Sequence, residues 1–548
     1  MTMVDQIFEQ SSSRRPRVPK PSEVGVLRAQ AKALAEAEAA EPLTANAAMD
    51  AHYDSHADEP EIPDVPNHGR PLRNMSEVRH FFRTNKTPIY FVGATPVNLL
   101  GLDRWVRKFN YITYYDGWDG AHPRVFTPSE KPYVDFQSGE EINNWLLLNP
   151  EVREYIDNRR AEGGPRPKIA MVFFNEETEA ICEELGYDLI LPSAELRERL
   201  DSKIVTTQLG NAAGAASVPN VLGAAKNYKE LCKLADEASL GSDLVVQTPY
   251  GDSGKTTFFI ASESDWDKHA KYMVDEQLKV MKRINNRPVA VEAVLTHCGT
   301  VVGPILTELA GFKELTPYKG GWCGNEMYQN VVTDSQRERT IDLVRRVGDG
   351  LRKEGYQGFF EVDVLLDTDS DDVYLGELNP RISGASAITN VTAGAYADVP
   401  LFLFHLLEYL EVDFELDIDE INERWVELSE ADHWSHMIIK ETDDIVQFIT
   451  HAPKTGKYVL DSKGRLAFAR NSLDWHQLQN EKEAFFLRIY GVEDYRWKGA
   501  DLGVLVTKTR LQYTSKKGET RLSIDAKHLV DSIRAQYKGI DVPGAEGA

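Results

Sequence analysis

Apolar and acidic residues alternate along one segment of the chain, residues 359 to 367. Side chains on a strand point alternately to opposite faces, so Glu361 and Asp363 share one face while valines and leucines occupy the other. A polar run then predicts a turn, and apolar positions return from Val373 onward. The pattern predicts a β-hairpin in which Glu377 lies opposite Asp363.

Strand and helix patterns alternate between residues 88 and 198, which predicts a parallel sheet. The turn after the first strand, at Gly93, lacks the GxGxxG spacing, so it does not indicate a dinucleotide site. Strands are expected at residues 89–92, 111–115, 168–174 and 188–191, with helices at 99–109 and 176–185.

The remaining patterns divide the chain further. A helix is expected from Lys203, capped by Asp201 or Ser202 and ending near Gly214. Strands are expected at 243–247 and 288–296, helices at 338–353 and 401–410, and β-strands at 437–440, 445–450, 457–460, 485–490 and 502–508. The last group predicts a small barrel or sandwich, so the fold class is a multidomain combination of α/β and α+β parts.

Four units follow from these patterns and from composition. Residues 1–72 are poor in aromatics and rich in Ala, Glu, Pro and Asp, which predicts a mostly disordered arm with room for one helix. The expected domains are 73–198 with the parallel sheet, 199–410 with the acidic hairpin, and 411–548 with the β-rich region.

The bulk charge excludes some partners. The 548 residues carry a net charge of −24, and because nucleic-acid binding depends on clustered Lys and Arg, no nucleic acid is expected as a partner. No run approaches the roughly 18 to 20 apolar residues that span a bilayer, so no membrane partner is expected. Four scattered cysteines predict neither a disulfide framework nor a zinc knuckle, and a cytoplasmic location is expected.

The predicted hairpin brings together groups that suit a magnesium-nucleotide site. Asp363, Glu377 and Asn379 offer the oxygen ligands that Mg²⁺ prefers. Arg381 keeps its charge at any working pH, so it suits a phosphate or an oxyanion. A hairpin with a solvated acidic face remains an equally open reading of this spacing.

The same residues carry a resemblance. The segment EVDVLLD, residues 361–367, resembles the penultimate ligand strand of the ATP-grasp superfamily, and GELNPRISGASAITNVTAG, residues 376–394, is similar to the asparagine-proline-arginine segment of carbamoyl phosphate synthetase large subunits. The resemblance implies ATP with two Mg²⁺ (or Mn²⁺) ions, held by Asp363, Glu377 and Asn379. It implies Arg381 as a phosphate or transition-state contact. Residues 73–198 would then form a Rossmann-like pre-ATP-grasp domain and 199–410 the nucleotide-binding module.

Two further segments match phosphate-binding parts of that family. The helix that begins at Lys203 looks like the one whose leading lysine reaches ATP phosphates, which gives Lys203 a binding and catalytic role. The family's second phosphate lysine is absent, because Gln247 stands at its place. Either Lys255 supplies that charge or phosphate binding is weaker. The loop 250–257 offers small residues whose N–H groups can approach phosphate oxygens, and its candidates are Gly251, Ser253, Gly254, Lys255 and Thr256.

Adenine and substrate contacts are expected after this loop. The strand 288–296 is similar to the family's hinge strand beside adenine, with Glu292, Ala293 and Leu295 at the matching positions. The glutamate that often holds the ribose is missing. The segment 308–330 is dense in Gly, Trp and Tyr and predicts a substrate-binding loop, although a surface loop is an equally open reading. Its candidate substrate contacts are Lys319, Trp322, Asn325 and Glu326.

Three functions remain open. The first is an ATP-dependent ligase that activates a small carboxylate as an acyl phosphate for attack by an amine or similar nucleophile. The second is a carboxylating enzyme similar to biotin carboxylase, although no biotin-facing residues or biotinylation motif are found. The third is a nucleotide-binding scaffold without catalysis, which the glutamine at 247 would suit. A homodimer is left open.

Overall fold

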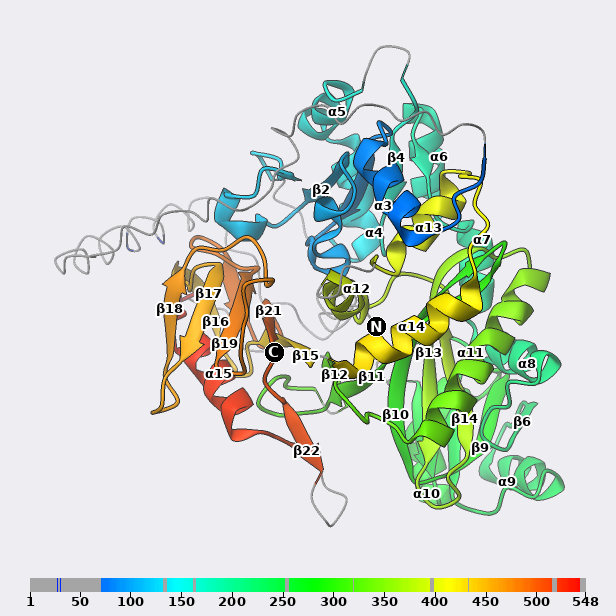
Figure 1. Cartoon of the computed structure of the whole chain (residues 1–548). Coiled ribbons are helices and arrows are strands. Elements are labelled where there is room, and N and C mark those ends of the chain that lie inside the picture. The colour runs from blue at the N-terminus through cyan, green and yellow to red at the C-terminus, as the bar shows by residue number, and fades with distance from the viewer. Residues whose placement is uncertain are drawn as a thin grey trace.

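The computed structural model describes Leu27, Gln30 and residues 70–131, 136–160, 164–251, 256–318, 320–394, 399–431, 433–514 and 520–542. Figure 1 shows three parts, with the N-terminal sheet at the top, the central sheets at the lower right and the C-terminal strands at the left. The predicted arm, residues 1–72, lies almost wholly outside the described residues.

The N-terminal part contains the parallel sheet that the sequence predicts. All four of its strand pairs are parallel, in the order β3-β2-β1-β4-β5. The strands are β1 (Ile89–Gly93), β2 (Phe109–Thr113), β3 (Val125–Phe126), β4 (Lys168–Ala170) and β5 (Asp188–Leu189). The helices and turns around it are α3 (Met75–Thr84), η2 (Val97–Leu99), η3 (Leu102–Arg104), η4 (Gly117–Gly120), α4 (Gly139–Leu148), α5 (Pro150–Asp157), α6 (Glu176–Leu185) and α7 (Ala194–Asp201).

Local sequence explains why the helix predicted at 176–185 is present and why the one predicted at 99–109 is not. Helix α6 begins after a capping box between Asn175 and Thr178 and ends at Gly186 in the left-handed region. The predicted helix at 99–109 is wrong, because that segment holds only short 3-10 turns. Gly101 interrupts it with a φ of 84°, and a Cβ there would lie 2.2 Å from the ring of Trp475.

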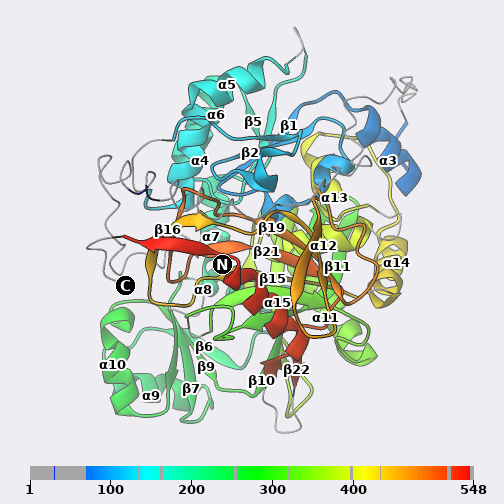
Figure 2. The ribbon, with the colours of Figure 1, turned by 90° about the vertical axis from the view of Figure 1, so that its left-hand side faces the viewer.

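A small antiparallel sheet follows, in the order β6-β9-β7-β8. Its strands are β6 (Asn220–Gly223), β7 (Leu244–Gln247), β8 (Thr257–Ile260) and β9 (Leu278–Lys282). Helices α9 (Tyr228–Glu237) and α10 (Glu263–Met273) cover one face, where Val246, Val280 and Trp266 share a core. Figures 1 and 2 both show this unit at the lower edge of the molecule, beside the larger sheet.

The larger sheet has ten strands in the order β14-β13-β10-β11-β12-β15-β21-β19-β17-β18. Its first half consists of β10 (Asn286–Thr296), β11 (Gly299–Ala310), β12 (Trp322–Met327), β13 (Gly358–Asp367) and β14 (Val373–Asn379). The helices around this half are α8 (Lys203–Ala213), α11 (Asp334–Lys353), α12 (Ser386–Gly394), α13 (Phe402–Tyr409) and α14 (Ile418–Ala431). The predicted hairpin is confirmed, with Asp363 directly opposite Glu377, and Val362 and Val364 pack in a core with residues of α11.

The C-terminal strands extend this sheet. All five predicted strands are found, but β15 pairs with β12, so most of them lengthen the central sheet and do not form a separate one. The predicted strands correspond to β15 (Trp434–Lys440), β16 (Val446–His451), β17 (Gly456–Leu460), β19 (Glu483–Arg488) and β21 (Asp501–Thr507). The structure adds β18 (Leu466–Arg470), β20 (Tyr495–Trp497), β22 (Gln512–Thr514), β23 (Thr520–Leu522) and β24 (Lys538–Asp541), with helix α15 (Ile524–Ala535). Strands β20, β16 and β24 form a three-stranded sheet, and β22 and β23 a hairpin.

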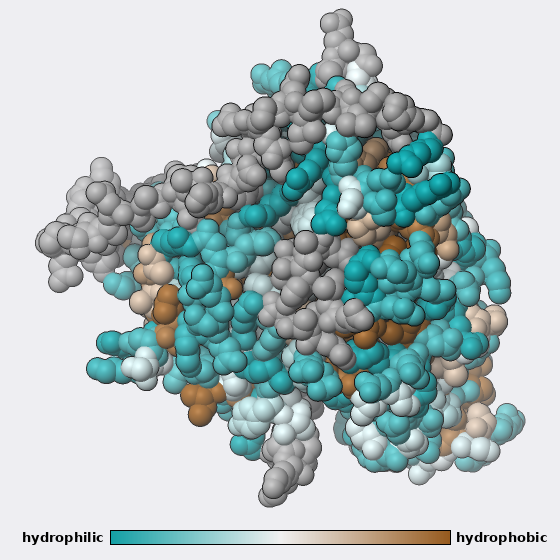
Figure 3. All heavy atoms as spheres, in the orientation of Figure 1, coloured by the Kyte–Doolittle hydropathy of each residue, from teal (hydrophilic) through white to brown (hydrophobic). Residues whose placement is uncertain are grey.

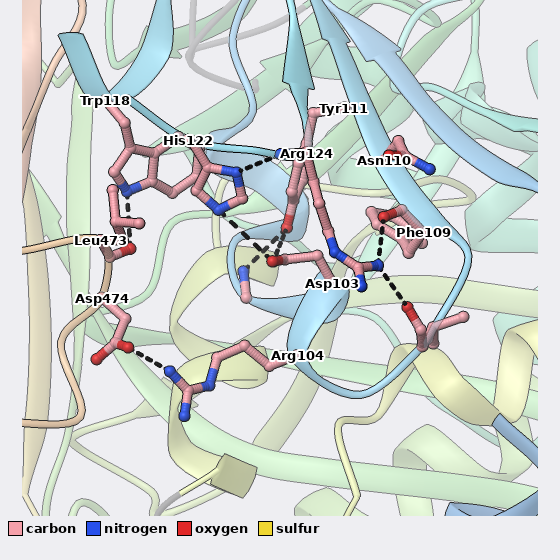
Figure 4. A network of polar contacts seen from close by, with 12 residues as sticks. Asp103, Arg104, Phe109, Asn110, Tyr111, Trp118, His122, Arg124, Leu473 and Asp474 are labelled. Carbon is pink, nitrogen blue, oxygen red and sulfur yellow. Dashed lines mark hydrogen bonds and ion pairs between the residues drawn. The ribbon is translucent and has the colours of Figure 1, made fainter. Parts of the chain in front are cut away.

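Polar contacts join the N-terminal and C-terminal parts (Figure 4). The indole Nε1 of Trp118 donates a hydrogen bond of 2.7 Å to the carbonyl of Leu473, and Arg104 forms an ion pair with Asp474. Within the N-terminal part, the buried Asp103 carboxylate accepts from the hydroxyl of Tyr111 at 3.0 Å. This interface fixes the N-terminal sheet against the rest of the chain.

The face of the molecule in Figure 3 is mainly hydrophilic, with smaller apolar patches between the polar side chains. Within the described part of the chain, no helix combines the length and apolar character needed to cross a bilayer. The four cysteines are free thiols.

Candidate active site

One face of the central sheet carries a row of polar side chains. Directly opposite residues on paired strands share a face, so the pairing of Asp363 with Glu377 and of Glu361 with Asn379 sets four polar groups side by side on β13 and β14. Glu292 of β10 lies opposite Glu361 on its other side. The row therefore runs across at least three strands.

The row continues onto β11, β12 and β15. Ala290 pairs with both Asp363 and Leu306, and Glu308 lies two residues after Leu306, so Glu308 shares the face of Asp363. Asn325 of β12 lies opposite Glu308, and His436 of β15 lies opposite Asn325. The polar face thus reaches from the hairpin to the C-terminal strands.

The carboxylates on this face repel one another. Burial and then the charge of Asp363 raise the pKa of Glu308 to about 8. Burial and then Glu292 raise the pKa of Glu361 to about 8, and burial with Glu361 and Glu377 raises the pKa of Asp363 well above its usual value. A cation bound on this face would favour the ionised carboxylates.

Lys203 places one positive charge beside these carboxylates. It is the first residue of α8, and its side chain is 4% exposed. Its Nζ donates to Oε1 of Glu377 at 2.8 Å and to the carbonyl of Gly251 at 2.6 Å. Ser202 occupies the N-cap position of this helix, but its side chain makes no capping hydrogen bond. Lys203 therefore joins the hairpin to the loop that follows β7.

A second buried lysine lies close to the first. Lys279 of β9 is 1% exposed, and its Nζ donates to the carbonyl of Gly376 at 3.4 Å. Burial lowers the pKa of Lys279 to about 8. The charge of Lys203 lowers this pKa further, and the charge of Glu377 partly offsets both effects. Gln247 of β7 lies directly opposite Lys279. The two lysines and Glu377 form one group of charges between the small and the large sheet.

Arg381 and Asn379 complete the hairpin end of the row. Both are buried, at 4% exposure each. The Nε of Arg381 lies 3.8 Å from the carboxylate of Asp201, the last residue of α7, and its charge lowers the pKa of Glu361. Arg381 therefore sits at the end of the row nearest α7.

Comparison with known proteins decides the fold. No family model matches the chain. The structure resembles that of a biotin carboxylase from Campylobacter jejuni, solved as a β-γ-ATP complex, with a TM-score of 0.56 and 15% identity over 82% of this chain and 97% of that one.

The chain has the ATP-grasp fold.

Curated relatives agree at lower coverage. The chain is 22% identical to Biotin carboxylase 1 of Bacillus subtilis over 42% of its own length and 50% of the relative's. It is 21% identical to the mitochondrial methylcrotonoyl-CoA carboxylase subunit alpha of Arabidopsis thaliana over 39% of its length and 29% of the relative's. The chain therefore spans half or less of these two relatives, and their activities enter only as proposals.

The predicted phosphate loop is described only at its ends. Gly251 has a φ of 135°, a left-handed value that favours glycine, and a Cβ there would lie 2.2 Å from the side chain of Thr256. The predicted contacts Ser253, Gly254 and Lys255 lie outside the described residues. Gly251 and Thr256 thus lie at the two ends of the predicted loop.

The predicted adenine contacts do not fit the structure. Strand β10 is hydrogen-bonded to β11 on one side and β13 on the other, so it has no free backbone edge for a base. The side chains of Ala293 and Leu295 belong to the apolar core that includes residues of α11. Glu292 is fully buried and accepts from the hydroxyls of Ser383 and Ser386. These three positions hold the sheet together.

Of the four predicted substrate contacts, Asn325 and Trp322 lie together, Glu326 lies apart from them, and Lys319 is not described. Asn325 lies on the polar face, and the indole Nε1 of Trp322 donates to its Oδ1 at 3.2 Å. Glu326 points to the opposite face, where its buried carboxylate accepts from the backbone N–H of Leu511 at 2.5 Å. Its predicted substrate role does not fit that position. Lys319 lies outside the described residues.

The donor set fits a divalent cation that takes further oxygen ligands from water or phosphate. Among the described residues, no group of three or more His, Cys, Asp or Glu side chains is placed to hold a metal ion unaided. Asp363 and Glu377 nevertheless face each other as a pair, with the carboxamide of Asn379 on the same face. Mg²⁺ usually keeps several waters and substrate phosphates, so two carboxylates and an amide are a suitable protein share.

Two residues of this site, Lys279 and Glu308, are not among the predicted site residues. Lys279 interrupts an apolar strand, LKVMK, which is a signal that could have marked it. Glu308 also interrupts an apolar strand, but the sequence alone gives no pairing that brings it to Asp363. The register between β10, β11 and β13 supplies it.

Proposed function

We propose that this protein is a Mg²⁺-dependent ATP-grasp ligase that joins a small carboxylate to an amine or similar nucleophile. The observation that carries this proposal is the joint position of Lys203, Glu377 and Asp363, where a buried cation from α8 meets the paired carboxylates of the hairpin. The location stays predicted as cytoplasmic, and a homodimer stays open.

The residues divide into two roles. Asp363, Glu377 and Asn379 would hold Mg²⁺, which neutralises phosphate charge when it is bound. Lys203 would turn from Glu377 toward the phosphates, and Arg381 would stabilise the developing negative charge. The protein mainly positions the reactants and neutralises charge, as is usual for phosphoryl transfer.

The reaction has two balanced steps. An oxygen of the carboxylate substrate attacks the γ-phosphorus of ATP, the bond to the β-γ bridging oxygen breaks, and ADP leaves. The resulting acyl phosphate is attacked at its carbonyl carbon by the nucleophile, which loses a proton as inorganic phosphate leaves. The buried polar face protects the acyl phosphate from water between these steps.

The acceptor site lies next to the carboxylates. The Oδ1 of Asn325 accepts from both Trp322 Nε1 and His436 Nε2, each at 3.2 Å, which fixes the orientation of the carboxamide. Its Nδ2 has no hydrogen-bond partner within the part of the chain that the structure describes. A buried donor without a partner is costly, so this group suits an oxygen of the substrate beside Glu308.

A panel of amino acids and small carboxylates, screened for ATP-dependent phosphate release with Mg²⁺, tests the reaction. Turnover should collapse in Glu377→Ala. Unchanged turnover in that variant would contradict the assignment of the hairpin.

A biotin-carboxylase-like reaction is the second candidate, because the structural likeness to such an enzyme extends over 97% of that chain. Bicarbonate would then be the carboxylate and a biotin nitrogen the nucleophile. Mass spectrometry of free biotin incubated with the protein, ATP and bicarbonate decides between the two, since only the second candidate adds carbon dioxide to biotin.

A further inference from the structure

We propose that Lys279 is a phosphate-binding residue, which supplies from β9 the positive charge that Gln247 of β7 does not provide. This inference rests on the proposed function, because it takes ATP as the ligand. It assigns a role to a residue that differs in strand and position from the two expected phosphate lysines, Lys203 and the one replaced by Gln247.

The register places Lys279 where a lysine at position 247 would point. The two residues are directly opposite in the antiparallel pair of β7 and β9, so their side chains leave the same face of the small sheet. That face is the one away from α9 and α10, because the neighbouring Val246 and Val280 fill the core under those helices. A lysine on either strand would therefore reach the same space.

Lys279 is directed at the hairpin. Its Nζ contacts the carbonyl of Gly376, and its charge interacts with Glu377 and Lys203. Among the described residues, Lys203 is ion-paired with Glu377, and Glu377 is also the carboxylate whose charge acts on Lys279. If Glu377 takes a metal ion, both lysines are released to bind phosphate oxygens.

The hydrogen bonding of Lys279 points the same way. An ammonium group has three donors, and a buried charge is costly unless it is paired. The one hydrogen bond that Lys279 makes within the described residues is 3.4 Å long, at the upper end for such a contact. Gln247, by contrast, already donates to Thr257 on the next strand at 3.1 Å. The under-satisfied cation, and not the amide, is the group prepared for an anion.

The test measures the binding of ATP, ADP and adenosine to the full chain by calorimetry. Lys279→Met removes the charge and keeps an apolar stem, and Lys282→Met, an exposed residue of the same strand, is the matched control. We expect Lys279→Met to weaken ATP and ADP binding on the order of 10-fold to 100-fold, the usual effect of losing a charge-assisted hydrogen bond, with adenosine affinity unchanged. The control should bind all three as the wild type does.

Exchanging the lysine and the glutamine between β7 and β9 gives the decisive variant. In the double variant Gln247→Lys with Lys279→Gln, the lysine returns to the other strand, and ATP affinity should recover to within a few-fold of the wild type. Gln247→Lys alone checks that the new lysine is tolerated.

Two results would overturn the inference. Wild-type ATP affinity in Lys279→Met would exclude a phosphate contact. An equal loss of adenosine and ATP, with a lower melting temperature, would show a structural role only. Failure of the wild type to bind ATP is a different outcome, and it would overturn the proposed function together with this inference.

Discussion

Replacing Glu361 with glutamine should make the metal-free protein more stable at high pH than the wild type. Glu361 is 7% exposed, and burial with the neighbouring Glu292 raises its pKa from 4.5 to about 8. Glutamine keeps the shape of the protonated acid but never ionises. The variant therefore isolates the free energy needed to ionise one carboxyl group on the polar face of the central sheet.

The sign follows from the protons bound in each state. Between pH 4.5 and 8 the unfolded chain has lost the Glu361 proton while the folded chain keeps it, so the free energy of unfolding falls as the pH rises. Each pKa unit is worth about 1.4 kcal/mol, and the shift corresponds to roughly 3 to 5 kcal/mol because the neighbouring acids titrate together. The stability that protonated Glu361 gives the folded state is fully present below pH 4.5 and is lost as the pH rises through 8.

Thermal melts from pH 4.5 to 8.5 in the presence of a chelator provide the assay. The melting temperature of Glu361→Gln should match the wild type at the acid end and exceed it by several degrees at the alkaline end. Glu237→Gln, an exposed glutamate on α9, is the control and should follow the wild-type curve. Parallel curves for Glu361→Gln and the wild type would refute the charge crowding of this face.

Three further predictions concern other parts of the molecule. Trp118→Phe removes the hydrogen bond to Leu473 and should lower the free energy of unfolding in a urea titration by about 1 kcal/mol while leaving ATP affinity unchanged; a loss of ATP affinity would contradict it. His405 is fully buried with its pKa lowered to about 4, so the free energy of unfolding should fall as the pH drops from 6.5 through 4, and His405→Gln should reduce this acid sensitivity in melts between those values. Gly384→Ala places a Cβ 2.5 Å from the ring of Trp322, so tryptophan fluorescence and acceptor-dependent phosphate release should change, whereas an unchanged spectrum would place the ring elsewhere.

Local sequence pattern was sufficient for the hairpin and for the start of α8. The alternation around Asp363, the turn and the return to Glu377 gave the hairpin with the correct opposite pair. Lys203 was found at the first position of its helix, which begins where the sequence predicts. These features depend on neighbours along the chain, so periodicity and capping residues reveal them.

Long-range pairing was the part that the sequence could not supply. Ala293 and Leu295 matched a hinge strand, yet β10 is an interior strand of the sheet, paired with β11 on one side and β13 on the other, and the sequence of β10 alone does not show this pairing. Glu326 differs from Asn325 by one position, and that single step turns its side chain to the opposite face. The role proposed for Lys279 depends on its pairing with Gln247 of β7, which the sequence does not show.

The C-terminal strands illustrate the same limit. Five of them were predicted in place, but the union of four of these with β12 in one ten-stranded sheet depends on a pairing between distant segments. This union carries the polar face from Glu308 to His436. This polar face is therefore shared between segments that the sequence assigns to different domains.

The most direct test of the central claim is calorimetric binding of ATP with and without Mg²⁺, in the wild type and in Glu377→Ala. The account predicts that the wild type binds ATP more tightly when Mg²⁺ is present, and that the variant loses this dependence because one of the two paired carboxylates is gone. Absence of ATP binding in the wild type, or an unchanged response to Mg²⁺ in Glu377→Ala, would contradict it.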